Sequence, residues 1–292
     1  MRVRLVIAAA LCAVAVGARA QPPAPAWFFL QLSDPQIGMQ TGDADFVQET
    51  ASFEFAIAAA NRLKPAFVVV TGDLVNKPGD AAQIAEYRRV AAKLDRTIPL
   101  YNVAGNHDVA NQPTPESLAA YTSAFGPDHY GFTVRNLAGI VLDSTLIAAP
   151  GAVRAAYAEQ ERWLRAELER LRSAAPAHVV IFQHHPWFLT HAAESDQYFN
   201  IPFERRGNYL ALFREAGVRY LFSGHYHRNQ LASDGRLEMI TTGPVGKPQG
   251  GDKSGFRVAI VREDRIEHRY YDFGDLPSRI DTKDAKDTKA TK

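Results

Sequence analysis

Residues 27–38 read WFFLQLSDPQIG, an apolar run that ends abruptly in a polar turn. The run WFFLQLS consists mostly of aromatic and aliphatic residues, which predicts a buried β-strand. Asp34 and Gln36 follow on either side of Pro35, so a carboxylate and an amide stand where the strand ends. In α/β proteins the chemistry lies where strand ends converge at one edge of a sheet. The segment therefore predicts one part of a functional site.

The same arrangement recurs four more times along the chain. The polar turns are Gly72-Asp73 after AFVVVT, Gly105-Asn106-His107-Asp108 after LYNVA, His184-His185-Pro186 after HVVIFQ, and Gly224-His225-Tyr226-His227 after VRYLFS. Taken alone, each turn also suits a structural role, because Asp, Asn and Gly are common turn formers. Together the turns bring five of the nine histidines and several carboxylates to strand ends. These are the side chains that divalent metal ions bind.

Segments with helical periodicity alternate with these strands. Apolar side chains recur at helical spacing in residues 46–63, 80–94, 157–172 and about 204–216. Alternating strands and helices predict parallel strand pairing with the helices outside. Later segments predict a second, more antiparallel sheet, with strands at residues 129–134, 138–143, 236–242, 255–261 and 265–272. We therefore expect an α/β fold in which helices flank two back-to-back mixed β-sheets.

The two ends of the chain differ from this body. Residues 1–20 have a basic start, an apolar stretch and an A-x-A cleavage site, as secretory signals do. The apolar stretch is short for a membrane span. We expect this signal to be removed, leaving a domain over residues 21–275 that is periplasmic or secreted and has no membrane anchor. Residues 276–292 are dominated by polar and charged side chains and predict a disordered tail.

Removal of the signal changes the charge and the cysteine content. The chain has 33 basic and 32 acidic residues, and loss of Arg2, Arg4 and Arg19 leaves 30 against 32, a formal charge of −2. A protein without a basic field is not expected to bind nucleic acid. The single cysteine, Cys12, also leaves, so the mature protein has no disulfide and depends on its hydrophobic core.

Taken in order, the five polar turns resemble the calcineurin-like metallophosphoesterase superfamily, which includes purple acid phosphatases and many phosphodiesterases. The family pattern D-x-H, G-D, G-N-H-[DE], H and G-H-x-H is matched by Asp34, Asp73, Asn106-His107-Asp108, His184 and His225-x-His227. The match extends over about residues 27–261. Five motifs in the right order are a specific signal, and they imply the four-layer metallophosphoesterase sandwich.

The resemblance also implies two divalent metal ions, which can be Mn, Fe, Zn or Mg. Asp73 is expected to bridge both ions. One ion would also take Asp34, His227 and Gln36, and the other Asn106, His184 and His225. In such a site the ions hold an attacking hydroxide and neutralise charge on the phosphoryl oxygens. His107 is expected to protonate the leaving oxygen, with Asp108 orienting its imidazole and raising its pKa.

Gln36 departs from the family pattern, which usually has histidine there, and resembles a subgroup whose first motif is D-P-Q. An amide oxygen is a harder and weaker ligand than imidazole, which favours Mn or Mg and a labile ion. The alternative is that Gln36 only hydrogen-bonds a water on the metal.

Three further elements are expected to support the site. His185 would stand behind the metal ligands, or else be a core residue. Arg228 would bind the substrate phosphate together with Asn106 and His107, or else be a solvated surface residue. The long connection 187–203 carries aromatic side chains that would either stack on a substrate or close a small core beneath the loop.

These expectations describe an exported, dinuclear-metal-dependent hydrolase of phosphate esters, acting on small molecules or phosphoproteins and favouring phosphomonoesters. A phosphodiesterase or nucleotide pyrophosphatase is the alternative, because the G-N-H-D motif serves both reactions. The alternative of another class is a protein that binds metal or phosphate without catalysis. Loss of His107 or Asp73 would have favoured that alternative, and both residues are present.

Overall fold

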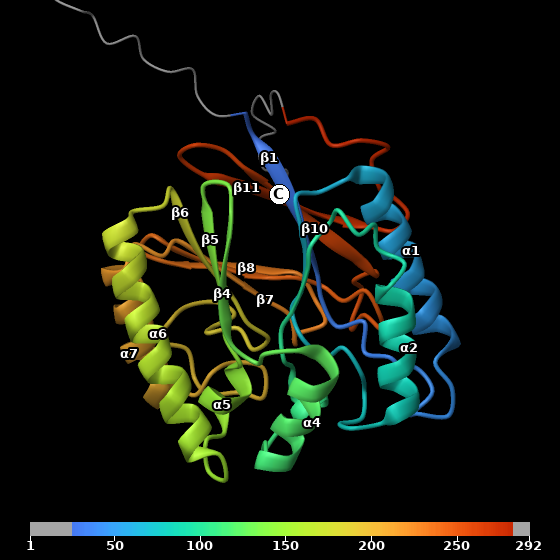
Figure 1. Cartoon of the computed structure of the whole chain (residues 1–292), viewed down its shortest axis with the longest axis horizontal. Helices are drawn as coiled ribbons and strands as arrows, with labels where there is room; N and C mark the ends of the chain where they lie inside the picture. The colour runs from blue at the N-terminus through green and yellow to red at the C-terminus, as the bar shows by residue number, and fades with distance from the viewer. Residues whose placement is uncertain (1–24, 283–292) are drawn as a thin grey trace, which may run out of the picture.

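The structure, a computed structural model, describes residues 25–282 (Figure 1). The predicted secretory signal, residues 1–20, lies outside the described residues, as do residues 283–292 of the predicted tail. The described chain forms four layers in the order helix, sheet, sheet, helix. The predicted fold class is confirmed.

The first sheet has the strand order β11-β10-β1-β2-β3. Its strands are β1 Trp27–Leu32, β2 Val68–Val70, β3 Leu100–Asn102, β10 Gly255–Val261 and β11 Ile266–Asp272. β1, β2 and β3 are parallel neighbours, whereas β10 pairs antiparallel with β1. The carboxyl ends of β1, β2 and β3 therefore lie side by side at one edge.

The second sheet has the strand order β4-β5-β6-β7-β9-β8. Its strands are β4 Tyr130–Val134, β5 Leu137–Val141, β6 His178–Phe182, β7 Tyr220–Ser223, β8 Gln230–Asp234 and β9 Leu237–Thr241. β5, β6, β7 and β9 are parallel, and antiparallel β4 and β8 close the two edges. β6 and β7 are neighbours, so the turns that follow them also meet.

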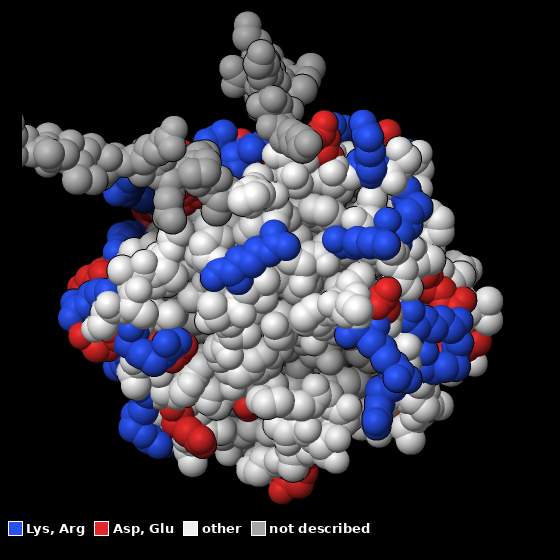
Figure 2. Space-filling model, turned by 45° about the horizontal axis from the view of Figure 1, so that its top comes forward, with Lys and Arg blue, Asp and Glu red and all other residues white. Residues whose placement is uncertain are grey.

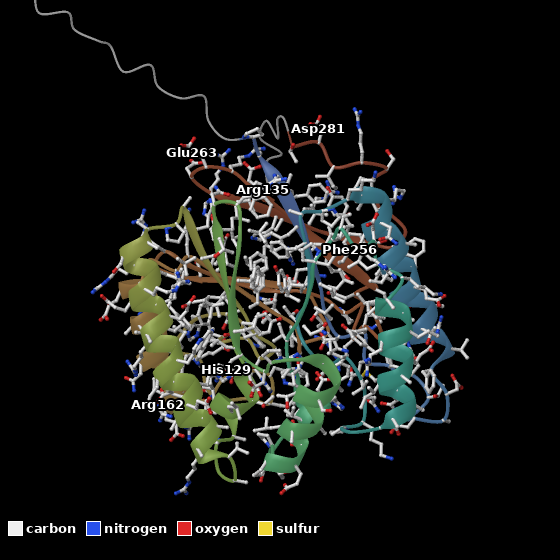
Figure 3. The ribbon with its side chains drawn as sticks, in the orientation of Figure 1. His129, Arg135, Arg162, Phe256, Glu263 and Asp281 are labelled. Carbon is white, nitrogen blue, oxygen red and sulfur yellow. The ribbon has the colours of Figure 1, made fainter. Side chains whose placement is uncertain are left out.

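Helices cover the outer face of each sheet (Figure 1). On the first sheet lie α1 Val47–Leu63, α2 Ala81–Ala91 and α4 Pro115–Phe125, and Phe256 of β10 packs in the cluster that they share (Figure 3). On the second lie α6 Arg154–Ala174 and α7 Phe203–Glu215. The short helices α3 Asn106–Val109 and α5 Ser144–Ala148 follow β3 and β5. None of the helices within residues 25–282 has the length and apolar character needed to cross a membrane.

Aromatic side chains join the two sheets. Phe29 of β1 stacks on Phe67 with ring centroids 4.6 Å apart. It also meets Phe182 and Phe222 of the second sheet edge-on, at 5.7 and 5.5 Å. Edge-to-face pairs of this kind stabilise by about 0.5–1.5 kcal/mol beyond the area they bury. This contact fixes β1 relative to β6 and β7, the strands that carry the site from the second sheet.

The structure corrects three sequence predictions. The strands predicted at 255–261 and 265–272 join β1 in the first sheet instead of building the second, and β8 was not predicted. Local alternation of apolar residues identifies a strand but not its partner, because partner choice depends on contacts far along the chain. In the predicted tail, Leu276 and Ile280 pack against the first sheet's core cluster, so residues 276–282 belong to the body.

Candidate metal centre

Strands from both sheets deliver polar side chains to one place. Turns after β1, β2 and β3 carry Asp34, Asp73 and Asn106, and turns after β6 and β7 carry His184, His225 and His227. All six side chains are buried. The site lies where the two sheets meet at their carboxyl ends, the end of the molecule that carries α4 and α5 (Figure 1).

The donor atoms form two clusters that share one residue. Asp73, His184 and His225 make one cluster, and Asp34, Asp73 and His227 make the other. Within each cluster the ligand atoms lie within 4.8 Å of one another. A carboxylate common to two clusters is the arrangement expected of a residue that bridges two ions.

Several lone-pair-bearing atoms face one another directly. Nε2 of His184 lies 3.3 Å from Oδ2 of Asp73 and 2.9 Å from Oδ1 of Asn106. Nε2 of His227 lies 3.5 Å from Oδ1 of Asp34. Atoms that carry lone pairs repel one another unless a proton or a metal cation lies among them, so the donor set suits cations.

Each of the three histidines has one ring nitrogen that forms a hydrogen bond to a backbone carbonyl, which leaves the second ring nitrogen for a metal. Nδ1 of His184 donates to the carbonyl of Thr71 at 2.9 Å, and Nδ1 of His227 donates to that of Lys247 at 2.6 Å. Nε2 of His225 donates to the carbonyl of Tyr198 at 3.1 Å. Because a carbonyl can only accept, these bonds fix the tautomers and leave Nε2 of His184, Nε2 of His227 and Nδ1 of His225 free to bind metal.

The turns that carry the donors are strained. Five predicted ligands have left-handed backbone conformations, with φ of 47° at Asp34, 42° at Gln36, 49° at Asp73, 69° at His225 and 54° at His227. Such a conformation costs a non-glycine residue about 1–2 kcal/mol. Strain of this kind persists only where the surrounding structure enforces it, and it concentrates at functional sites.

Two motif glycines leave space that the ligands use. A Cβ on Gly72, whose φ is +89°, would lie 2.3 Å from Nδ1 of His184. A Cβ on Gly224 would lie 1.8 Å from the hydroxyl of Ser33 and 2.5 Å from Oδ2 of Asp34. The backbone after Gly224 then binds Asp34 directly, because the N–H of His225 donates to both oxygens of its carboxylate, at 3.1 and 3.2 Å.

The charges of the cluster are strongly coupled. Burial opposes a charge on His184, but the carboxylates of Asp73 and Asp34 outweigh burial and raise its pKa to about 9. Burial and the neighbouring His184 lower the pKa of His225 to about 4. Burial opposes the charge of Asp73 as well, yet the surrounding histidines hold its pKa below the ordinary value. Because imidazole binds metal only when the binding nitrogen is unprotonated, metal binding here releases protons.

Gln36 has an amide oxygen without a partner. Its Nε2 donates to Oδ1 of Asn76 at 3.1 Å, while its buried Oε1 accepts no hydrogen bond from any residue in the described part of the chain. An unpaired buried carbonyl oxygen costs about 1–3 kcal/mol. A bound ion or a water on that ion would remove this cost, so the observation fits both predicted roles of Gln36.

His107 is oriented by a group that the sequence did not reveal. Its Nδ1 donates to the backbone carbonyl of Asn76 at 2.8 Å, and Nε2 of its half-buried ring has no hydrogen-bond partner among residues 25–282. Its backbone N–H donates to Oδ1 of Asp73 at 2.8 Å. Asn76 has no motif context of its own, and it lies 31 residues before His107 in the chain.

The predicted orienting role of Asp108 is therefore corrected. Its Oδ1 accepts the backbone N–H groups of Leu74 and Val75 at 2.9 and 3.1 Å, and its Oδ2 accepts that of Gly105 at 2.8 Å. Burial and the nearby charge of Asp73 raise the pKa of Asp108. The carboxylate ties the turns after β2 and β3 together, and within residues 25–282 none of its hydrogen bonds goes to the imidazole it was expected to hold.

His185 and Arg228 differ in their surroundings. The buried ring of His185 lies 4.3 Å from that of His225 between centroids, and its Nδ1 is 2.9 Å from the hydroxyl of Ser144. It therefore supports a predicted ligand from behind. Arg228 is exposed and its guanidinium lies over the ring of Tyr226, 5.5 Å from the centroid. Its role in binding substrate stays a prediction.

The connection 187–203 divides into two parts. Trp187 and Phe188 are fully buried in the core of the second sheet, which supports the core interpretation for them. Tyr198 and Phe199 instead lie against His225, with ring centroids 5.0 and 5.6 Å away. The hydroxyl of Tyr198 accepts from Nδ2 of Asn106 at 3.3 Å. Tyr198 thus contacts two predicted ligands of the same ion, as expected for the aromatic side chains of this loop, whereas Trp187 and Phe188 lie in the core.

Comparison with known proteins identifies relatives over most of the chain. A model of the calcineurin-like phosphoesterase family matches residues 29–229. A serine/threonine-protein phosphatase CPPED1 from Bos taurus is 37% identical over 268 residues, covering 87% of this chain and 86% of that protein. A probable cyclic nucleotide phosphodiesterase from Psychrobacter arcticus is 28% identical over 240 residues, covering 73% and 78%.

Solved structures share the fold. A dimetal phosphatase from Danio rerio superposes with a TM-score of 0.62 at 19% identity, covering 85% of this chain and 96% of that one. A purple acid phosphatase from yellow lupin gives a TM-score of 0.64 at 13% identity, covering 84% and 51%.

Proposed function

The chain belongs to the calcineurin-like phosphoesterase family of metal-dependent phosphoric ester hydrolases, and we propose that it is an exported phosphomonoesterase acting on phosphoproteins. One observation carries the reaction class: Asp73 is shared by two clusters of buried metal-binding side chains. Two divalent ions bound there would activate water for attack and neutralise charge on the phosphoryl oxygens.

The side chains of the protein would bind the ions and donate a proton. One ion would be held by Asp34, His227 and Gln36. The other would be held by Asn106, His184 and His225, and Asp73 would bind both ions. Nε2 of His107 would give a proton to the leaving oxygen, since Nδ1 is already engaged with Asn76. The hydrogen bond from His107 to Asp73 keeps this acid beside the bridging ligand. Proton transfer by a positioned side chain contributes about 10²–10⁴-fold to a rate.

Two observations support the choice of substrate and compartment. The relatives that match at 34–37% identity over about the same region are named serine/threonine-protein phosphatases. Residues 1–20 have the pattern of a secretory signal.

Lys and Arg side chains stand singly or in small groups on the face seen in Figure 2, with Asp and Glu among those at the flanks. That nucleic acid is not a partner stays a prediction, which rests on the formal charge of −2 left after removal of the signal.

A panel of esters tests the proposal. The mature protein, reconstituted with Mn, Fe, Zn or Mg and with bound metal quantified, would be assayed on an aryl phosphomonoester, the corresponding bis-ester and a phosphoserine peptide. We expect kcat/KM to be higher for the monoester and the peptide than for the bis-ester. The opposite order would support a phosphodiesterase, the activity named for the Psychrobacter relative. No hydrolysis of any ester by metal-loaded protein would support a binding protein.

Export is tested separately. Expression of the full chain in a bacterium, followed by fractionation and mass determination of the mature N-terminus, should recover a protein in the periplasm or medium that begins at Gln21. Retention of residues 1–20 on a cytoplasmic product would contradict export without affecting the proposed reaction.

A further inference from the structure

An open cavity of about 660 Å³ lies outside the metal-binding cluster. It is bounded by the loop 148–152 between α5 and α6, by Arg154 and Tyr157 of α6, by Arg205 of α7, and by Gln112. α5 begins at Ser144, whose hydroxyl contacts His185 beneath the metal ligands. The cavity therefore belongs to the same end of the molecule as the metal centre.

The charged residues that line this cavity are both arginines. Neither aspartate nor glutamate is among its lining residues. The chain as a whole has a formal charge of only +1, so the pair is not part of a generally basic protein. The neighbouring hollow, which shares Arg205 and Tyr157, contains Glu161, Glu204 and Arg165 and is of mixed charge. Positive charge is concentrated on the side that faces Gln112.

The two arginines have unused hydrogen-bonding capacity. Arg154 is exposed and forms no ion pair or side-chain hydrogen bond with any residue in the range 25–282. Arg205 lies over the ring of Tyr157 at 5.8 Å, and its buried Nε has no partner among those residues either. Its one ion pair within that range, to Glu204 at 3.1 Å, involves a carboxylate whose side chain is 73% exposed. An exposed pair of this kind contributes little.

The side chain of Tyr198 contacts both a predicted metal ligand and the residue that precedes Gln112 of the cavity. The hydroxyl of Tyr198 accepts from Asn106, a predicted metal ligand, at 3.3 Å and lies 3.4 Å from Oδ1 of Asn111. Gln112, the next residue, lines the cavity. The chain from Asn106 to Gln112 is about six residues long, which bounds the path between them at roughly 20 Å. An extended peptide covers such a distance in about six residues or fewer.

We propose that this cavity is a second anion-binding subsite, in which Arg154 and Arg205 hold an acidic side chain or a second phosphate ester that flanks the phosphorylated residue of a protein substrate. The inference rests on the proposed phosphatase function. Arginine suits the task because its planar guanidinium binds carboxylate and phosphate oxygens in pairs. Gln112 and the hydroxyl of Tyr157 add neutral hydrogen-bonding groups beside the charges.

Matched peptides test the subsite. Three phosphoserine peptides of one sequence would carry glutamates, glutamines or a second phosphoserine at positions about one to six residues from the scissile phosphate. We expect wild-type kcat/KM to be about tenfold higher for the two anionic peptides, which corresponds to about 1.4 kcal/mol. In Arg154→Gln/Arg205→Gln the preference should fall to about twofold, with activity on an aryl phosphomonoester unchanged. Whether the carboxylate or the phosphate peptide gains more identifies the natural anion.

A charge-matched control separates the cavity from net charge. Arg96 and Arg162 are exposed, and Arg162 lies on α6 at the flank of the molecule (Figure 3). Arg96→Gln/Arg162→Gln removes the same charge and should keep the preference. Equal preference of wild type for neutral and anionic peptides, or equal loss in both double variants, would overturn the subsite. Because Arg205→Gln removes a contact with Tyr157, the single variant Arg154→Gln tests the inference without a change in buried packing.

A binding measurement keeps this inference separate from the proposed function. Equilibrium binding of phosphonate versions of the same peptides, which cannot be hydrolysed, should show the same preference and the same loss in Arg154→Gln/Arg205→Gln. If wild type hydrolyses no ester but binds the anionic phosphonates more tightly, the phosphatase proposal fails and the subsite stands. If wild type hydrolyses all the peptides equally and binds their phosphonates equally, the subsite fails and the phosphatase proposal stands.

Discussion

The backbone N–H of His107 donates a 2.8 Å hydrogen bond to Oδ1 of Asp73. This bond joins the predicted proton donor to the predicted bridging ligand through the main chain. The imidazole of His107 takes no part in it, and a second bond, from Nδ1 to the carbonyl of Asn76, orients the ring. The position of the acid and the orientation of its ring are thus set by different groups, and substitutions can separate them.

Replacing His107 by alanine keeps its backbone bond to Asp73 and removes only the ring. We expect kcat on an alkyl phosphomonoester to fall by about 10²-fold or more, because the leaving oxygen loses its proton donor. Metal content, measured on the same samples, should stay at the wild-type value. An aryl ester with an acidic leaving group needs less protonation and should lose less. An equal loss on both esters would contradict the acid role.

Replacing Asp108 distinguishes a structural carboxylate from one that tunes His107. Asp108→Ala leaves three buried N–H groups without their acceptor, so we expect the free energy of unfolding to fall by about 3 kcal/mol or more. Denaturant unfolding measures this loss. Asp108→Asn retains one acceptor oxygen and should lose less. In the folded, metal-loaded Asp108→Asn protein the acidic and basic limbs of the pH–rate profile should match wild type. A shift of either limb would restore the orienting role.

The contribution of Gln36 to metal retention is tested by replacing its side chain, which carries the unpaired amide oxygen. Gln36→His supplies an imidazole, and we expect the variant to retain more metal than wild type after mild chelation. Gln36→Leu supplies no donor and should retain less. The metal-to-protein ratio after a fixed chelation time is the measurement. Equal ratios in all three proteins would show that residue 36 does not contribute to metal retention.

Glycine at position 72 is tested against a glycine of similar backbone conformation. Gly72→Ala places a Cβ against the ring of His184 in addition to straining the backbone, whereas Gly79, with φ of +71°, has no atom within 4 Å of an added Cβ. We expect Gly79→Ala to cost about 1–2 kcal/mol and to keep both ions. Gly72→Ala should cost more and lose metal. Full metal content in Gly72→Ala would mean that His184 can move without loss of the site.

Glu194 gives the loop 187–203 a predicted pH dependence. Burial raises the pKa of its carboxyl group, but hydrogen bonds from Thr190, Asn200 and the backbone of Leu189 and Thr190 outweigh burial and lower it to about 2. A lowered folded-state pKa contributes stability above the unfolded value of about 4.3 that is lost as pH falls toward 2. Glu194→Gln should therefore reduce the unfolding free energy by about 2–3 kcal/mol at pH 7 and by about half as much at pH 3.

The measurement is denaturant unfolding at both pH values with a chelator present, so that metal loss does not contribute. Glu215 is exposed and has no bonded partner within residues 25–282, and Glu215→Gln should change stability by no more than about 0.5 kcal/mol at either pH. An equal effect of Glu194→Gln at both pH values would contradict the prediction, because it would not depend on the charge of the carboxylate.

The sequence by itself determined which residues meet at the candidate metal centre. Apolar runs predict strands, and polar residues directly after several parallel strands must meet at one edge, so Asp34, Asp73, Asn106, His184 and His225 can be grouped from the sequence alone. The glycines that stand next to these residues, Gly72, Gly105 and Gly224, can also be identified from the sequence as parts of the turns. This information is local, because each motif spans only a few residues and records the strand end, the turn and the donor together.

Only the tertiary structure decided how these residues are held. The carbonyl of Asn76 on His107, the three backbone bonds of Asp108 and the contacts of Tyr198 join segments that no periodicity relates. The same holds for β10, which pairs with β1 although the two strands lie near opposite ends of the chain. A side chain's type limits the partners it accepts, but packing of the two sheets selects among them. The sequence therefore reveals the chemistry of the site, and the fold assigns the supporting contacts.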